Sequence, residues 1–118
     1  MVIFITGKSG AGKTTLANKL KTDKTIIIDG DDFREHFKAG FSLDEKGEHI
    51  IKMAKTAAMI EKQGFQVIVS AILPLKRFRD LARKYCRESL LIYLSGGSLW
   101  EGTKYEIPGD DELCLILS

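Results

Sequence analysis

Hydrophobic residues along the chain occur in two patterns: short, nearly uninterrupted runs, and longer segments in which they recur every three or four positions. The runs are rich in β-branched and aromatic side chains, which is typical of buried strands. They occupy residues 2–5, 25–28, 66–69, 90–94 and 112–117. The segments between them predict helices at 15–20, around 30–34, between 42 and 64, and from 74 to 85.

Two of these helices have recognisable boundaries. Ser42 and Glu45 form a capping box in front of the longest helix, and Gly64 ends it. Pro74 suits the first turn of the helix that follows. The expected apolar faces are Ile50, Ala54, Ala57 and Ala58 on the first of these helices and Leu75, Phe78, Leu81 and Tyr85 on the second.

Strands that are buried and separated by helices predict an α/β domain over residues 1–118, with a mostly parallel five-stranded sheet covered on both faces. Ligands of such sheets bind beyond the carboxyl ends of the strands. Gly7, Asp29 and Ser70 each follow one of the expected strands. We therefore expect these residues to share one edge of the sheet.

The composition is that of an ordinary globular chain. Of 118 residues, 44% are hydrophobic and 29% are charged, which argues against disorder and against a membrane span. The first hydrophobic run is too short for a signal peptide or an anchor. A net charge of +2 is too small to indicate nucleic-acid binding by itself. Cys86 and Cys114 lack metal-site spacing, so we expect reduced thiols in a cytoplasmic protein.

Residues 7–14 read GKSGAGKT and match the phosphate-binding loop pattern G-x-x-x-x-G-K-T. Its glycines allow the backbone amides to face phosphate oxygens, and the following helix adds the positive end of its dipole. Lys13 would contact the β- and γ-phosphates of a nucleotide, and the Thr14 hydroxyl would ligate Mg²⁺. A turn that binds nothing is disfavoured because strand, helix and every fixed motif position are present. The expected nucleotide-binding residues are Gly7, Lys8, Ser9, Gly10, Ala11, Gly12, Lys13, Thr14 and Thr15.

Asp29 and Asp31 follow the second expected strand and would face this loop. Carboxylates there suit Mg²⁺ coordination and acceptance of a proton from an attacking hydroxyl. The alternative is a turn with a helix-capping Asp, which accounts well for Asp32. It accounts less well for Asp29, because a carboxylate that closes a buried strand needs a partner. Since Ser70 ends the third strand, we expect Thr14, water and residues 29–31 to hold the metal.

The helix after Pro74 carries six basic residues: Lys76, Arg77, Arg79, Arg83, Lys84 and Arg87. They would bind phosphates if they formed a nucleic-acid surface. Asp80 and Glu88 interrupt the run, so a solvated face is favoured, with Lys76 as an exception near the site. His36 and His49 have no metal-ligand partners at suitable spacing, so surface or pocket positions are expected for them.

Several segments together resemble the adenylylsulfate kinase family. They are GKSGAGKTT at 7–15, DGDDFR at 29–34, GFS at 40–42, SAILPLK at 70–76 and GTKYEIP at 102–108. The resemblance implies a three-layer P-loop kinase fold. It also implies transfer of the γ-phosphate of ATP, with Mg²⁺, to the 3′-hydroxyl of adenosine 5′-phosphosulfate.

The resemblance also implies roles for individual residues. Asp29 would be the catalytic carboxylate alongside Lys13, and Asp31 would lie beside the metal with Thr14. Arg34 would hold the phosphosulfate of the acceptor, and Phe41 would stack on its adenine. The other positions that match the acceptor site are Lys46, His49, Ile72 and Lys76. A nucleotide-like small molecule is the expected partner, and a homodimer is compatible with the resemblance.

The sequence departs from the family at three places. Lys46, His49 and Ile51 stand where the family usually has Arg, Asn and Arg, and residues 73, 75 and 76 replace Ser, Phe and Arg. The basic lid after the fourth strand is missing, and residues 94–101 bridge its place. Trp100 and Tyr105 would form a small aromatic flap there, or would pack a surface loop onto the core. Another hydroxyl acceptor (a nucleoside, a sugar or a polynucleotide end) and a nucleotide-binding module without transfer activity stay open as alternatives.

Overall fold

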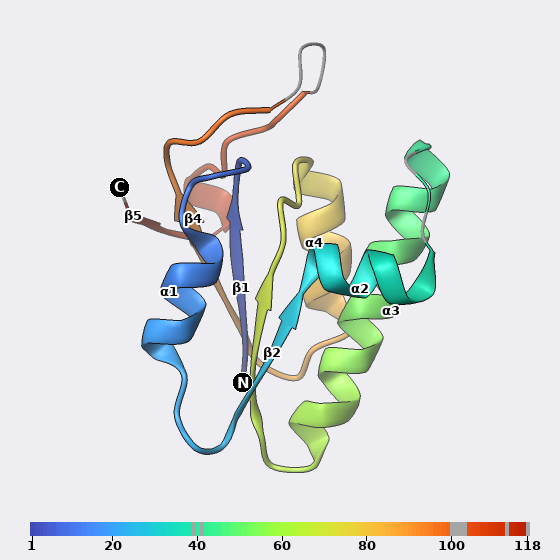
Figure 1. The fold of residues 1–118 in the computed structure, drawn as a ribbon, viewed down its shortest axis with the longest axis vertical. Coiled ribbons are helices and arrows are strands. Elements are labelled where there is room, and N and C mark those ends of the chain that lie inside the picture. Colours follow the sequence, from blue (N-terminus) through green and yellow to red (C-terminus); the bar gives the residue numbers. More distant parts are fainter. Residues whose placement is uncertain (39, 41, 100–103, 113, 118) are drawn as a thin grey trace.

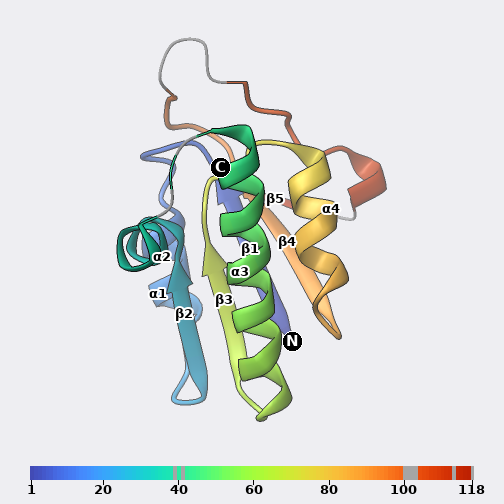
Figure 2. The same ribbon diagram turned by 90° about the vertical axis from the view of Figure 1, so that its right-hand side faces the viewer.

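A computed structural model describes residues 1–38, 40, 42–99, 104–112 and 114–117. Five parallel strands form one sheet in the order β2-β3-β1-β4-β5. Helix α1 packs against β1 and β3 on one face, and α3 and α4 lie on the other, so the fold has three layers (Figures 1 and 2). The strands are β1 (Val2–Gly7), β2 (Thr25–Asp29), β3 (Gln66–Ser70), β4 (Ser89–Leu94) and β5 (Cys114–Leu117). The helices are α1 (Lys13–Leu20), α2 (Gly30–Phe37), α3 (Leu43–Lys62), α4 (Lys76–Lys84) and the short 3₁₀ turn η1 (Asp110–Glu112).

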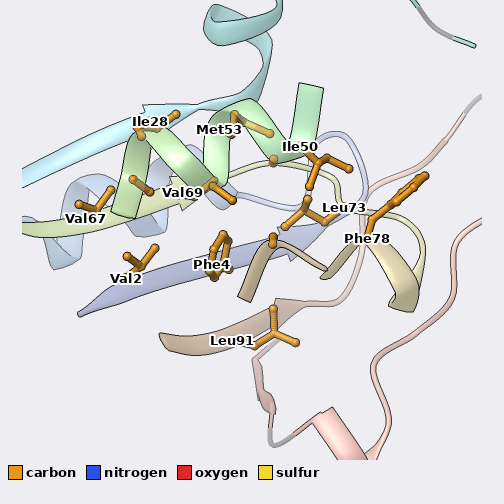
Figure 3. Packing of buried hydrophobic residues seen from close by; sticks show 14 residues of the cluster. Val2, Phe4, Ile28, Ile50, Met53, Val67, Val69, Leu73, Phe78 and Leu91 are labelled. Carbon is orange, nitrogen blue, oxygen red and sulfur yellow. The ribbon is translucent and has the colours of Figure 1, made fainter. Parts of the chain in front are cut away.

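Alternate residues of β1 supply two hydrophobic cores, because successive side chains of a strand point to opposite faces. Val2 and Phe4 face α3 and α4, where they join the larger cluster (Figure 3). Ile3 and Ile5 face α1 and pack with Ala17. The predicted α/β architecture with a parallel five-stranded sheet is therefore confirmed.

The two outer strands are less covered than predicted. β2 and β5 lie at the edges of the sheet, and only Ile28 of β2 is buried among its hydrophobic residues. In β5, Leu115, Ile116 and Leu117 are exposed. The prediction that every strand is buried on both faces is thus wrong for these two strands, because the helices on the two faces pack mainly over the central strands β1 and β3.

Two helices begin at other residues than predicted. α1 begins at Lys13 rather than Thr15, because Gly12 takes a left-handed conformation (φ 100°) that separates loop from helix. α4 begins at Lys76 rather than at Pro74, because Leu73 is left-handed (φ 46°) and Leu75 is extended. Pro74 therefore lies in the β3–α4 loop. Among the described residues, no helix combines the length and the apolar character needed to cross a membrane.

Candidate phosphate-binding site

The phosphate loop connects β1 to α1 at the carboxyl edge of the sheet (Figure 1). Gly10 and Gly12 have φ angles of 82° and 100°, which residues with a Cβ rarely adopt. Gly12 precedes the helix and has no side chain to cap it, so the first amides of α1 can donate hydrogen bonds to a bound anion. This geometry agrees with the motif at 7–15, and the loop can bind phosphate.

Lys13 lies over the loop that precedes it. Its Nζ donates a hydrogen bond to the carbonyl oxygen of Lys8 at 2.9 Å. Burial lowers the pKa of Lys13, whereas the carboxylates of Asp31 and Asp29 act in the opposite direction. The ammonium group is therefore bound to the loop and influenced by the charge of the two carboxylates, and it can neutralise phosphate charge.

The two carboxylate oxygens of Asp29 accept hydrogen bonds from different elements. Oδ1 accepts hydrogen bonds from the amides of Asp31 (2.9 Å) and Asp32 (3.3 Å), so Asp29 caps α2. Oδ2 accepts a hydrogen bond from the Thr14 hydroxyl at 3.2 Å. The capping role that the sequence suggested for Asp32 thus belongs to Asp29, and capping still leaves one oxygen for the loop.

Asp29 ends β2 at the carboxyl edge of the sheet, and the start of α2 packs closely against the residue that follows β3. Asp29 pairs with Ser70 in the sheet, and a Cβ on Gly30 would lie 2.8 Å from the Cβ of Ala71. The Thr14 hydroxyl and the nearby carboxylates are hard oxygen ligands, which would suit Mg²⁺. Asp31, the carboxylate assigned to the metal from sequence, is exposed beside them.

The described residues that are expected to bind an acceptor lie on α2, on α3, in the β3–α4 loop and at the start of α4. His49 is buried (4% exposed) and its ring meets that of Phe33 edge-on, with centroids 5.4 Å apart. Arg34 and Lys46 are half-buried, and Phe41 lies outside the described residues. A cavity of about 120 Å³ lies between α2 and α3, lined by Phe37, Lys38, Gly40, Glu45, Glu48, His49 and Lys52.

The β3–α4 loop is fixed by contacts that the sequence did not reveal. The Thr6 hydroxyl donates to the carbonyl of Ile72 and lies 2.7 Å from the Tyr105 hydroxyl. The Tyr105 ring stacks on Tyr93 with centroids 5.9 Å apart. For Tyr105 this favours packing onto the core over a flap; Trp100, its suggested companion, lies outside the described residues.

Lys76 and Arg79 of the basic helix both pair with carboxylates. Lys76 Nζ lies 2.6 Å from Asp80 and 3.5 Å from Asp111, and these carboxylates raise its pKa. Arg79 is 1% exposed and pairs with both oxygens of Glu112 at 2.7 and 3.0 Å. The prediction of a solvated face is therefore wrong for Arg79, whereas Arg77, Lys84 and Arg87 are exposed.

Comparison with known proteins gives one consistent family. The model for adenylylsulphate kinase matches residues 1–96. An adenylyl-sulfate kinase of Paraburkholderia xenovorans is 39% identical over 98 residues, which are 76% of this chain and 55% of that protein. A probable adenylyl-sulfate kinase of Pyrococcus abyssi is 40% identical over 103 residues, which are 78% of this chain and 58% of that protein. The chain thus spans little more than half the length of these two curated relatives.

Solved structures agree with the sequence relatives. A Mycobacterium tuberculosis APS kinase in complex with AMPPNP and APS superposes with a TM-score of 0.70 at 28% identity, covering 79% of this chain and 61% of that one. A Cys556Ala mutant of an APS kinase from the same organism superposes with a TM-score of 0.75 at 26% identity, over 98% and 84% of the two chains. An unliganded sugar kinase of Janibacter, at 19% identity and a TM-score of 0.79, shares the fold alone.

Proposed function

The chain belongs to the adenylylsulfate kinase family, and we propose that it transfers the γ-phosphate of ATP, with Mg²⁺, to the 3′-hydroxyl of adenosine 5′-phosphosulfate. The observation that carries the proposal is the junction of Lys13, Thr14 and Asp29. The Thr14 hydroxyl contacts the Asp29 carboxylate at 3.2 Å, while Lys13 lies folded over the loop beside them. The M. tuberculosis relative solved with AMPPNP and APS supports both substrates.

Each residue of this junction has a separate task. The loop amides and Lys13 would hold the β- and γ-phosphates, because phosphoryl transfer depends mainly on positioning and charge neutralisation. Asp29 would orient the acceptor hydroxyl and take its proton as the new oxygen–phosphorus bond forms. The bond between the β,γ-bridging oxygen and the γ-phosphorus breaks, and ADP leaves with the electron pair. Thr14 and Asp31, together with water, would hold Mg²⁺, which supplies positive charge to the phosphates when it is bound.

The acceptor would lie on the side of α2 and α3. Arg34 would pair with its phosphosulfate group, since a guanidinium binds anionic oxygens bidentately. Phe41 would stack on its adenine. Lys46, His49, Ile72 and Lys76 complete the proposed acceptor side, although Lys76 must share its charge with Asp80. A homodimer is part of this proposal; one structural relative is a hexameric APS kinase of Thiobacillus denitrificans.

The proposal is tested by incubating the protein with Mg²⁺, ATP labelled at the γ-phosphate and a panel of acceptors. We expect label in 3′-phosphoadenosine 5′-phosphosulfate and none in nucleosides, sugars or polynucleotide ends. Asp29→Asn should lower kcat by at least about a hundredfold and leave ATP affinity nearly unchanged. Lys13→Ala should lower both transfer and ATP affinity. ATP binding without transfer to any acceptor would refute the proposal.

A further inference from the structure

The segment that follows β4 lies directly on the phosphate loop. We call residues 95–99 the clasp. The amide of Ser98 donates a hydrogen bond to the carbonyl of Ser9 at 2.9 Å, and the two residues form an antiparallel bridge. The amide of Ser95 donates to Leu117 of β5 at 3.0 Å, which ties the start of the clasp to the sheet. The clasp is thus held at both ends.

Gly97 makes the tightest contact between clasp and loop. A Cβ at this position would lie 2.4 Å from the carbonyl oxygen of Ser9, 2.9 Å from the amide nitrogen of Ala11 and 3.1 Å from the carbonyl oxygen of Lys8. All three atoms belong to the loop backbone, so no side chain can rotate away to make room. Any residue with a Cβ at position 97 must therefore displace either the loop or the clasp.

The loop atoms that Gly97 meets are linked to the catalytic cation. The carbonyl oxygen of Lys8 accepts hydrogen bonds from the amide of Ala11 at 3.2 Å and from Nζ of Lys13 at 2.9 Å. A shift of Lys8 would therefore move both an amide of the loop and the ammonium group. Phosphate binding is sensitive to such shifts, because it depends on donors that already point at the ligand.

We propose that Gly97 is a positioning residue for nucleotide binding: its close contact fixes Lys8 and Ser9, and thereby the place of the Lys13 ammonium group. Gly97 acts through the loop and does not touch the nucleotide. This inference rests on the proposed function in one respect, namely that nucleotide phosphates occupy the loop. The clasp, which occupies the place of the family's lid, would thus help to position the phosphate loop.

Gly96 provides a matched control. Gly96 and Gly97 have φ angles of 96° and 67°, so alanine is strained at both positions. A Cβ on Gly96, however, would meet nothing within 4 Å. Gly96→Ala therefore carries the backbone strain without the collision. The difference between the two alanine variants isolates the contact with the loop.

The experiment measures the dissociation constant of AMPPNP with Mg²⁺ for the full chain, Gly96→Ala and Gly97→Ala, together with KM values and melting temperatures. Gly97→Ala should raise the dissociation constant by about tenfold to a hundredfold. Gly96→Ala should change it by less than about threefold. The KM for ATP should rise in Gly97→Ala and the KM for the acceptor should not. Equal affinities of the two variants would overturn the proposal.

A second measurement applies if Gly97→Ala does not fold. Hydrogen exchange of the unmodified protein should show that saturating AMPPNP with Mg²⁺ slows exchange at the Ser98 amide as well as at the Ala11 amide. Unchanged exchange at Ser98 would contradict the proposal. If the unmodified protein binds no nucleotide at all, the proposed function itself fails. Tight binding with equal affinities of the two alanine variants leaves the proposed function intact and removes only the role of Gly97.

Discussion

His49 places a titratable ring in the interior between α2 and α3. Burial lowers the pKa of His49, and the positive charge of Arg34 lowers it further. The carbonyl of Gly30 and the carboxylate of Asp31 act in the opposite direction, and Lys52 adds a smaller lowering effect. The folded protein therefore favours the neutral ring, because a protonated ring would be repelled by the positive charge of Arg34.

This residue makes stability depend on pH with a definite sign. The pKa of His49 is lower in the folded state than its ordinary value of 6.5, so near that pH the unfolded chain binds more protons. The free energy of unfolding should therefore decrease as the pH drops from 6.5 towards the pKa of His49 in the folded state, by at most about 1.4 kcal/mol per pH unit. Urea unfolding between about pH 7.5 and 5.5 measures this slope. His49→Gln should flatten it.

His36 is the control, since it is exposed and is the other of the two histidines. His36→Gln should keep the slope of the unmodified protein. Equal slopes in all three proteins would show that His49 does not carry the effect.

The candidate site was predictable to the extent that its residues follow one another in the sequence. The loop motif identifies Lys13 and Thr14, and Asp29 is noticeable because it directly follows a hydrophobic run. The capping role at the start of α2 was assigned to Asp32, but Asp29 fills it. Three acidic residues within four positions fit a cap almost equally well, so the sequence could not distinguish them. The contact of Gly97 with Ser9 joins residues far apart in sequence, and no local pattern signals it.

At the scale of elements, α4 is anchored by a buried ion pair rather than by its apolar stripe alone. Arg79 donates to both oxygens of Glu112 and to the carbonyl of Leu73 at 2.9 Å. These bonds tie α4 to η1 and to the left-handed Leu73 of the β3–α4 loop. The sequence could not reveal the pair because its members are 33 positions apart and the cations of such a basic helix usually face solvent.

Arg79→Met should destabilise the protein by about 3–5 kcal/mol, because it leaves the Glu112 carboxylate buried without its partner. The double variant Arg79→Met/Glu112→Met should recover much of this loss, since two apolar side chains replace both charges. Lys84→Met changes an exposed cation of the same helix and should stay within about 0.5 kcal/mol. Denaturant unfolding measures all three free energies. A small effect of Arg79→Met would show that the pair is hydrated in solution.

At the scale of the whole molecule, the alternation of strands and helices was sufficient to predict the sheet and the edge at which the site lies. The order of the strands was not predictable, because a run such as that of β5 is equally hydrophobic at an edge and in the centre. The strand order places β5 at an edge, where three of its side chains are exposed. It also places β4 next to β1, so the clasp that follows β4 lies beside the phosphate loop. Both consequences depend on distant parts of the chain.

The connection from β4 to β5 has little of the positive charge that a kinase lid brings to the transferring phosphate. Its described part begins with the clasp, Ser-Gly-Gly-Ser-Leu, which carries no charged side chain and lies on the loop backbone. Across residues 95–112 the sequence contains one cation, Lys104. Tyr105 is committed to Thr6 and Tyr93. Lids exclude water from the phosphate as well as adding positive charge, so we expect this site to exclude water less completely than a site with a lid.

We therefore expect the protein to release phosphate from ATP without an acceptor, at a substantial fraction of its transfer rate. A coupled phosphate assay with and without adenosine 5′-phosphosulfate measures the ratio of hydrolysis to transfer. Lys13→Ala should abolish both activities together, which shows that they share one site. If no phosphate is released until the acceptor is added, the site closes in spite of the missing lid. Exclusion of water would then have to come from another segment or from a second copy of the chain.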